Sequence, residues 1–187
     1  STPIAAGRGQ PSKISTAPPV AVADRAGADD LALPDVVPML DEYPVLATIL
    51  RAGLPFHQGF LNIFDCSENA FVSTYRKTHK DGTFTMNVQY SSIPDLEGKP
   101  IILCDPMVAT GSSMLFTYKE LLSHGKPKSV HFATIVASME GLNYLKRNLP
   151  KKGVEIWVGA VDEELTAQSF IVPGLGDAGD LAYGRKI

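Results

Sequence analysis

The sequence reads IILCDPMVATGSS from Ile101 to Ser113, and this stretch decides the fold. Its apolar run from Ile101 to Cys104 is typical of a buried strand, which passes into a turn of small residues and then into a helix. Open parallel sheets bind ligands at the carboxyl ends of their strands. Because backbone N–H groups and the positive end of the helix dipole face such a turn, the stretch predicts a phosphate site.

The rest of the chain from residue 45 onward alternates between strand and helix patterns. The patterns predict strands at 45–50, 70–75, 84–90, 100–104, 130–137 and 154–161. They predict helices at 56–64, 113–124 and 139–148, a polar loop at 77–85 with an Asp81-Gly82 turn, and a long glycine-rich loop at 170–187. Such alternation implies right-handed crossovers, so we expect an α/β fold with a mostly parallel central sheet flanked by helices.

The composition of residues 1–44 differs from that of the remainder. This stretch holds seven of the 14 prolines together with many alanines and glycines. Proline removes a backbone donor and is excluded from helix interiors, so the stretch is predicted to be an arm of uncertain order. Residues 45–187 are expected to form one domain.

Charge and cysteine content exclude several classes of protein. The net charge of −3 provides no broad cationic surface for nucleic acid or an anionic membrane. The two cysteines form neither a disulfide framework nor a zinc-binding pattern, which favours a reducing cytoplasm. No apolar run approaches the length of a membrane span, and the N-terminus lacks the order of a secretory signal. We therefore expect a soluble protein.

Polar groups in the turn after residue 104 suit a sugar phosphate. Asp105 is placed to accept hydrogen bonds from sugar hydroxyls, Gly111 permits close approach of the backbone, and Thr110, Ser112 and Ser113 add hydroxyl donors. The alternative is that Ser112 or Ser113 is only a helix N-cap. The turn is not a Walker loop, since no lysine follows Gly111, and an ATPase is disfavoured.

Two runs of the sequence resemble loops of the uracil phosphoribosyltransferases. The run DPMVATGSS from Asp105 to Ser113 resembles the family's loop for 5-phosphoribosyl 1-pyrophosphate, usually DPMLATGGS, with Val108 and Ser112 as the departures. The run ILRAGL from Ile49 to Leu54 resembles its pyrophosphate loop. There Arg51 offers a fixed fork of donors at a strand end. Arg76 resembles a second pyrophosphate-binding arginine at the base of a mobile hairpin.

A third run, FIVPGLGDAGD from Phe170 to Asp180, is similar to the family's uracil-recognition loop. Uracil presents an acceptor–donor–acceptor edge, and exposed backbone groups of glycine-rich chain can match that edge and reject an amino group in its place. The alternative, a flexible tail, fits poorly with the apolar residues Ile171 and Val172. The resemblance covers about residues 45–187; residues 1–44 do not fit the family.

The resemblance implies a role for particular residues. The implied catalytic residues are Arg51, Arg76, Asp105 and Asp177. Those implied to bind the phosphoribosyl donor are Arg51, Arg76, Asp105, Pro106, Met107, Val108, Ala109, Thr110, Gly111, Ser112, Ser113 and Asp177. Those implied to bind uracil are Ile171, Gly176, Asp177 and Ala178.

The resemblance also implies a fold and an activity. The fold is like that of type I phosphoribosyltransferases, with a β-hairpin arm near 76–90 that closes over the site and a C-terminal base-recognition loop. The activity is conversion of uracil and 5-phosphoribosyl 1-pyrophosphate to UMP and pyrophosphate, in pyrimidine salvage. Magnesium is implied as a cofactor held through pyrophosphate and water, with no direct protein ligand. GTP is implied as an effector and a homo-oligomer as the assembly.

Two other functions stay open on the sequence. A regulator of the same fold would bind UMP or the phosphoribosyl donor without turnover. A related transferase would use a different base. Turnover distinguishes the first from an enzyme, and competition among uracil, cytosine, hypoxanthine and adenine distinguishes the second.

Overall fold

The computed structural model describes residues 42–78 and 84–185. Its strands are β1 (Val45–Leu50), β2 (Asn69–Thr78), β3 (Phe84–Ser92), β4 (Pro100–Cys104), β5 (Met107–Val108), β6 (Ser129–Ser138), β7 (Val154–Asp162), β8 (Glu164–Leu165) and β9 (Ile171–Val172). Its helices are α1 (Leu54–Leu61), α2 (Ser112–Leu122), α3 (Met139–Asn148) and α4 (Ala178–Tyr183). Every strand and helix predicted from the patterns is present. Residues 1–41 of the predicted N-terminal arm and the Asp81-Gly82 turn lie outside the described residues, so the domain boundary stays a prediction.

The central sheet is mostly parallel, as predicted. Its strands run in the order β3-β2-β1-β4-β6-β5, and β7 also pairs with β6. All of these pairs are parallel except β2 with β3, which form an antiparallel pair of long strands. From β1 the chain moves to β2 on one side and later returns to β4 on the other side. This reversal creates a crevice beyond the carboxyl ends of β1 and β4, where open sheets bind ligands.

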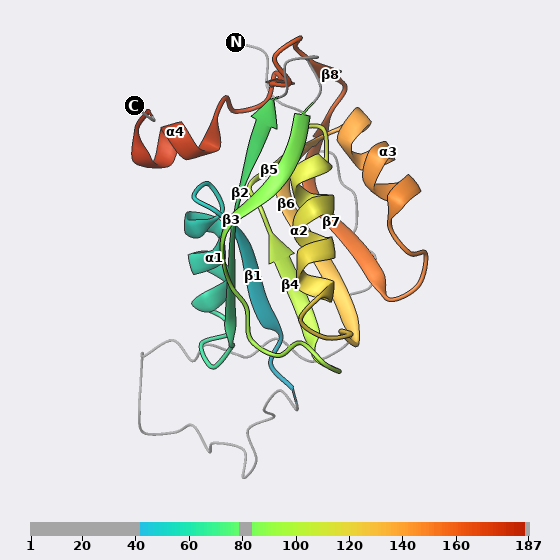
Figure 1. The fold of residues 1–187 in the computed structure, drawn as a ribbon. Coiled ribbons are helices and arrows are strands. Elements are labelled where there is room, and N and C mark those ends of the chain that lie inside the picture. The colour runs from blue at the N-terminus through green and yellow to red at the C-terminus, as the bar shows by residue number, and fades with distance from the viewer. Residues whose placement is uncertain (1–41, 79–83, 186–187) are drawn as a thin grey trace, which may run out of the picture. The chain divides into compact units, whose positions relative to one another are not determined.

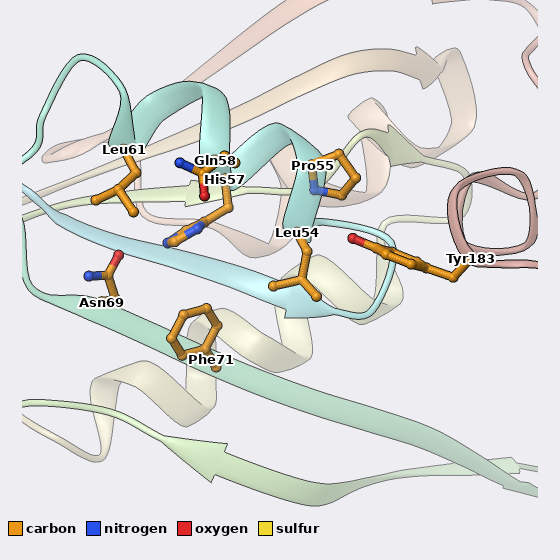
Figure 2. A pocket seen from close by; sticks show the side chains of 8 residues that line it. All are labelled: Leu54, Pro55, His57, Gln58, Leu61, Asn69, Phe71 and Tyr183. Carbon is orange, nitrogen blue, oxygen red and sulfur yellow. The ribbon is translucent and has the colours of Figure 1, made fainter.

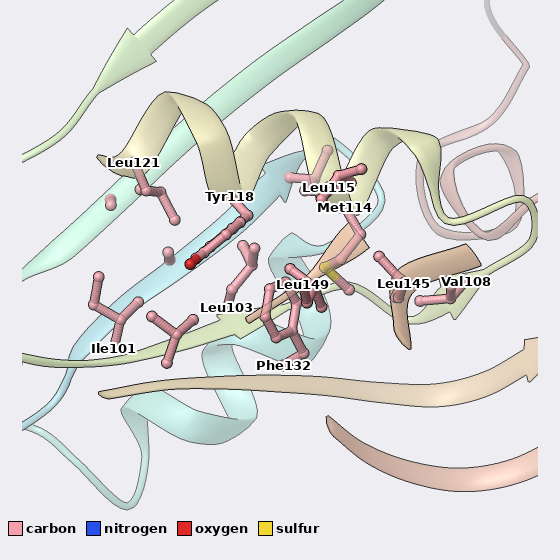
Figure 3. Packing of buried hydrophobic residues seen from close by; sticks show 14 of the residues in the cluster. Ile101, Leu103, Val108, Met114, Leu115, Tyr118, Leu121, Phe132, Leu145 and Leu149 are labelled. Atoms are coloured by element: carbon pink, nitrogen blue, oxygen red, sulfur yellow. The ribbon is translucent and has the colours of Figure 1, made fainter. Parts of the chain in front are cut away.

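Helices cover both faces of this sheet, with α1 on one side and α2 and α3 on the other (Figure 1). Under α2, buried side chains from β4, β6 and α3 form the main core (Figure 3). Phe132 at its centre is 1% exposed and packs against the ring of Tyr118 at 5.5 Å. Cys104 is fully buried, as expected from its apolar neighbours. No helix among the described residues is long and apolar enough to cross a membrane.

Two predicted loops were partly wrong. In the range 77–85, β2 continues to Thr78 and β3 begins at Phe84, because backbone pairing of Lys77 with Thr85 and of Thr78 with Phe84 extends the hairpin regardless of polarity. In the range 170–187, the chain forms β9 and then α4. The helix α4 begins because the side chain of Asp177 accepts a hydrogen bond from the backbone N–H of Asp180.

The start of α3 lies directly against the turn that follows β5. Ser138 caps α3: its hydroxyl accepts from Gly141 N–H at 2.9 Å and donates to the Ala109 carbonyl at 2.5 Å. A Cβ atom on Gly141 would lie 2.3 Å from that carbonyl oxygen and 3.0 Å from the carbonyl oxygen of Val108. The turn therefore keeps its position only if residue 141 has no side chain.

Replacing Gly141 by alanine is expected to lower the free energy of unfolding by about 1–3 kcal/mol, because the turn must move to admit the methyl group. Gly59→Ala is the matched control. Gly59 lies within α1 with no atom within 4 Å of its ideal Cβ, so its replacement should raise stability by about 0.4–1 kcal/mol. Urea denaturation measures both variants, and equal effects would contradict this reading of the contact.

Candidate active site

A cavity of about 490 Å³ opens at the carboxyl ends of β1 and β4. Three segments far apart in the sequence line it. They are the end of β1 with the following loop (Ile49, Leu50 and Ala52), the turn after β4 with the start of α2 (105, 107–111, 113 and 114), and the C-terminal segment (168–170 and 177–179). Thr74 of β2 completes the lining. We call residues 105–113 the phosphate turn and residues 170–180 the base-recognition loop, after the roles predicted for them. The resemblance predicts that these two segments share a site, and both contribute residues to this one cavity.

The predicted site residues divide into two groups. Nine of them line this cavity: Asp105, Met107, Val108, Ala109, Thr110, Gly111, Ser113, Asp177 and Ala178. Five others with described side chains are not in its lining: Arg51, Pro106, Ser112, Ile171 and Gly176. Arg76 lies in β2, where its backbone pairs with Met86, and its side chain lies outside the described part of the structure.

The phosphate turn places backbone donors at the start of α2. Gly111 is the N-cap, with a left-handed φ of 77°, and no side chain caps this helix. The alternative that Ser112 or Ser113 is the N-cap is therefore wrong. A Cβ on Gly111 would lie 2.8 Å from the Gly141 carbonyl oxygen, so glycine is required on steric grounds too. The hydroxyls of Thr110 and Ser112 are 2.7 Å apart and hydrogen-bond to each other at the helix N-terminus.

Asp105 follows β4 and is one of the residues that line the cavity. Its backbone N–H donates to the Ala133 carbonyl at 3.1 Å, which fixes the residue to β6. Burial raises the pKa of Asp105 from 3.8 to about 8. Folding therefore favours the protonated form of this carboxyl group, which ionises more easily when a cation or hydroxyl donors arrive beside it.

Arg51 follows β1 but turns toward α4. Its Nη2 atom donates to Asp180 Oδ1 at 2.9 Å and to the Gly184 carbonyl at 2.8 Å. Its guanidinium carbon lies 6.0 Å from the ring centroid of Tyr183. Leu50, one residue earlier, lines the cavity, so the arginine lies beside the site while its donors point to the C-terminal helix.

The base-recognition loop is anchored before it reaches the cavity. Ile171 is 3% exposed and pairs with Leu165 in the small β8–β9 sheet, so its side chain serves packing. Gly174 N–H donates to Asp162 Oδ2 at 3.0 Å, and Gly176 adopts a left-handed φ of 82°. The loop then delivers Asp177 and Ala178 to the cavity wall.

Sequence reasoning missed several residues of the cavity. Gln168 and Ser169 belong to the connection between β8 and β9, and Ser169 has a φ of 65°. Phe170, which is 43% exposed, is the first residue of the run that resembles the uracil-recognition loop, and it was not assigned a role. An aromatic residue directly before a glycine-rich loop was a usable signal, because aromatic rings at ligand cavities stack on planar groups. Thr74 carried no signal, since it is one of several polar residues along β2.

A second hollow of about 480 Å³ lies between α1 and β2, with Tyr183 of α4 at one end (Figure 2). The ring of His57 points into it toward Asn69 (Figure 2). Burial lowers the pKa of His57, with opposing contributions from Asn69 and the Leu46 backbone. Of the three motifs, only ILRAGL contributes a residue, its last, Leu54; because the hollow shares no lining residue with the cavity at β1 and β4, it is separate from the candidate active site.

The cavity suits a metal ion that is held mostly by substrate and water. No group of three His, Cys, Asp or Glu side chains in the described ranges is arranged to hold a metal. Asp105 and Asp177 are the titratable side chains among the cavity's described lining residues. Magnesium typically keeps several waters and takes one or two carboxylates together with substrate phosphates. These residues therefore fit the implied magnesium.

The architecture and the strand-end turn define the class of type I phosphoribosyltransferases. Hypoxanthine phosphoribosyltransferase from Staphylococcus aureus shares the fold, with a TM-score of 0.52 at 16% identity over 78% of this chain and 80% of that chain. The structure of a protein from Aquifex aeolicus is more similar. Its TM-score is 0.68 at 36% identity, over 80% of this chain and 69% of that one.

Sequence comparison identifies the family within this class. The uracil phosphoribosyltransferase family model matches residues 38–185. The uracil phosphoribosyltransferase of Porphyromonas gingivalis is 54% identical over 76% of this chain and 66% of its own length. That of Methanothermobacter thermautotrophicus is 36% identical over 75% of this chain and 63% of its own length. The chain belongs to the uracil phosphoribosyltransferase family, and it spans less than two thirds of the length of these two relatives.

The raised pKa of Asp105 predicts a pH-dependent cost to folding. An unfolded chain ionises this carboxyl near pH 4, whereas the folded protein resists ionisation until about pH 8. The stability that the group contributes is complete below pH 4 and is lost as the pH rises through this window. Asp105→Asn should therefore be more stable than wild type at pH 8, on the order of 1–3 kcal/mol, with a smaller difference near pH 4.

Chemical denaturation across pH 4–9 measures this effect. Asp65→Asn is the control, because it removes an exposed carboxylate from the loop after α1. Parallel stability curves for Asp105→Asn and wild type would show that the carboxyl is not held protonated.

Proposed function

We propose that this protein is an active uracil phosphoribosyltransferase of the cytoplasm. It joins uracil to 5-phosphoribosyl 1-pyrophosphate, forms UMP and releases pyrophosphate. The observation that carries the proposal is that the phosphate turn (105–113) and the end of the base-recognition loop (177–179) line one cavity. A sugar phosphate on the first can therefore meet a pyrimidine on the second.

The donor's 5′-phosphate binds at the turn between Thr110 and Ser113. Backbone N–H groups at the start of α2 and the hydroxyl of Thr110 supply donors, and the helix dipole favours the negative charge. Asp105 accepts hydrogen bonds from the ribose hydroxyls, which favour its ionised form. Pro106, Met107, Val108, Ala109 and Ser112 shape this turn. Together these contacts fix the sugar so that its anomeric carbon faces the base.

Uracil binds against the loop from Ile171 to Ala178. Backbone N–H and C=O groups of Gly176, Asp177 and Ala178 match its acceptor–donor–acceptor edge and disfavour an amino group. Ile171 acts through its backbone, since its side chain is buried. The half-exposed ring of Phe170 on the cavity wall is available to cover the face of the base.

In the reaction, a uracil ring nitrogen bonds to the anomeric carbon as the bond to pyrophosphate breaks. Charge grows on the departing phosphates, and Arg51 and Arg76 stabilise it. Asp177 would hold magnesium through water, and the ion would supply further neutralisation of the charge on pyrophosphate. The β2–β3 hairpin excludes water from the cationic sugar when it closes over the cavity.

The proposal extends to regulation and assembly as the family resemblance implies them, with GTP as an effector and a homo-oligomer as the working form. Apolar side chains such as Ile63, 73% exposed, and Leu181, 70% exposed, are available to an interface between copies. The curated relatives carry the name of an enzyme, which favours turnover over the binding-only regulator.

A spectrophotometric assay of uracil, 5-phosphoribosyl 1-pyrophosphate and magnesium is expected to show UMP and pyrophosphate in equal amounts. Omission of magnesium should abolish most turnover. Cytosine, hypoxanthine and adenine should compete poorly, because each lacks the full pattern of the uracil edge. Well-folded protein that binds the donor without turnover would support the regulator instead.

Arg51→Ala is expected to lower kcat by about 100-fold, because the leaving group loses a charged donor pair. Its free energy of unfolding should change by less than about 1 kcal/mol, since the ion pair with Asp180 is partly exposed. Lys99→Ala is the matched control, because it breaks the ion pair of Lys99 with Glu68 away from the cavity. The side chain of Lys99 is 32% exposed, and that of Arg51 is 31% exposed. If Arg51→Ala and Lys99→Ala have the same kcat, the assignment of Arg51 is wrong.

A further inference from the structure

The helix α4 joins the candidate active site to Arg51. Asp177, its N-cap, lines the cavity, and its Oδ1 atom accepts from Asp180 N–H at 2.8 Å. The side chain of Asp180 in turn accepts from Arg51 Nη2. A Cβ on Gly179 would lie 3.2 Å from Asp177 Oδ1 and 3.9 Å from Arg51 Nε, so this part of α4 packs closely between the two.

The contacts of Arg51 use the donors that a phosphate needs. A guanidinium group binds two oxygens through either of two edges, Nε with Nη2 or Nη1 with Nη2, because the third edge is blocked by Cδ. Both usable edges include Nη2. Its two hydrogens are already directed at Asp180 and at the Gly184 carbonyl. Arg51 therefore cannot grip a phosphate through two oxygens until α4 gives up at least one of these contacts.

The strength of the ion pair between Arg51 and Asp180 decides whether it prevents a phosphate from binding Arg51 or only competes with it. The side chain of Arg51 is 31% exposed and that of Asp180 is 36% exposed. Pairs this exposed to solvent contribute little, typically well below the attraction of a multiply charged phosphate. Arg51 Nε is buried without an acceptor among the described residues, so one donor of a usable edge is unsatisfied. The ion pair is therefore strong enough to lower affinity and weak enough to be displaced.

We infer that Asp180 is a positioning residue that competes with pyrophosphate for Arg51. This inference rests on the proposed function, because that function assigns the leaving group to Arg51. When pyrophosphate binds, Arg51 exchanges the Asp180 carboxylate for phosphate oxygens. When pyrophosphate departs, Asp180 takes the guanidinium back, which favours release of this product. The ring of Tyr183 remains beside the guanidinium in either arrangement, as a surface along which it turns.

Asp180→Asn is the test, because the amide keeps the shape of the side chain and loses its charge. Titration calorimetry with pyrophosphate and magnesium, on the full chain, is expected to show about two- to fivefold tighter binding than wild type. Pyrophosphate should also become a stronger product inhibitor by a similar factor. Asp180→Glu, which restores a carboxylate, should return the affinity toward that of wild type. Asp65→Asn is the control for loss of one negative charge elsewhere and should bind as wild type does.

If Asp180 had a purely structural role, Asp180→Asn would lower the affinity for pyrophosphate instead of raising it, since disordering of α4 would weaken binding. Equal or weaker binding of pyrophosphate by Asp180→Asn, including no binding by either protein, overturns the inference. The uracil assay is a separate readout. Absence of UMP formation by wild type, with the expected difference in pyrophosphate affinity intact, would refute the proposed function and leave the competition for Arg51 standing.

Discussion

The site depends on the pairing of β4 with strands on both of its edges. β4 lies between β1 and β6, in register from Ile101 to Cys104 on one side and from Pro100 to Cys104 on the other. At its carboxyl end, Thr48 Oγ1 donates to the Cys104 carbonyl and Cys104 Sγ donates to the Ala47 carbonyl. A Cβ on Gly53 would lie 2.0 Å from Thr48 Oγ1. The phosphate turn and the Arg51 loop therefore share one buried anchor, which fixes the spacing between them.

A protein of net charge −3 must attract a polyanion by local means. Under the proposed function, backbone amides at the cavity would do this, helped by a carboxyl group that is less easily ionised. Burial raises the pKa of Asp105 to about 8, which favours its neutral form. The cost is paid in stability at higher pH, a pattern common where a site is organised for binding. Charge complementarity here comes from burial as well as from the arginines.

The features that depend on short-range pattern were predictable from the sequence. Apolar periodicity located the strands and helices, and the small-residue turn at 105–113 located part of the cavity wall, because both signals come from residues close together in the sequence. The partners of Arg51 were not predictable, since Asp180 and Gly184 lie more than 120 residues away along the chain. The same limit applies to Gln168 and Ser169, whose place on the cavity wall is set by the β8–β9 pairing.

The helix α4 shows why a glycine-rich segment is a poor guide to its own structure. Gly174 and Gly176 occupy left-handed conformations in an irregular loop, whereas Gly179 lies within α4, where a Cβ would come 3.2 Å from Asp177 Oδ1. The loop brings Asp177 and Ala178 to the cavity wall, and the helix places Asp180 against Arg51. One stretch of some fifteen residues thus supplies both part of the cavity wall and the partner of Arg51. Because the ion pair between Asp180 and Arg51 is partly exposed, α4 would be able to exchange this contact for substrate charges without disturbing the sheet beneath.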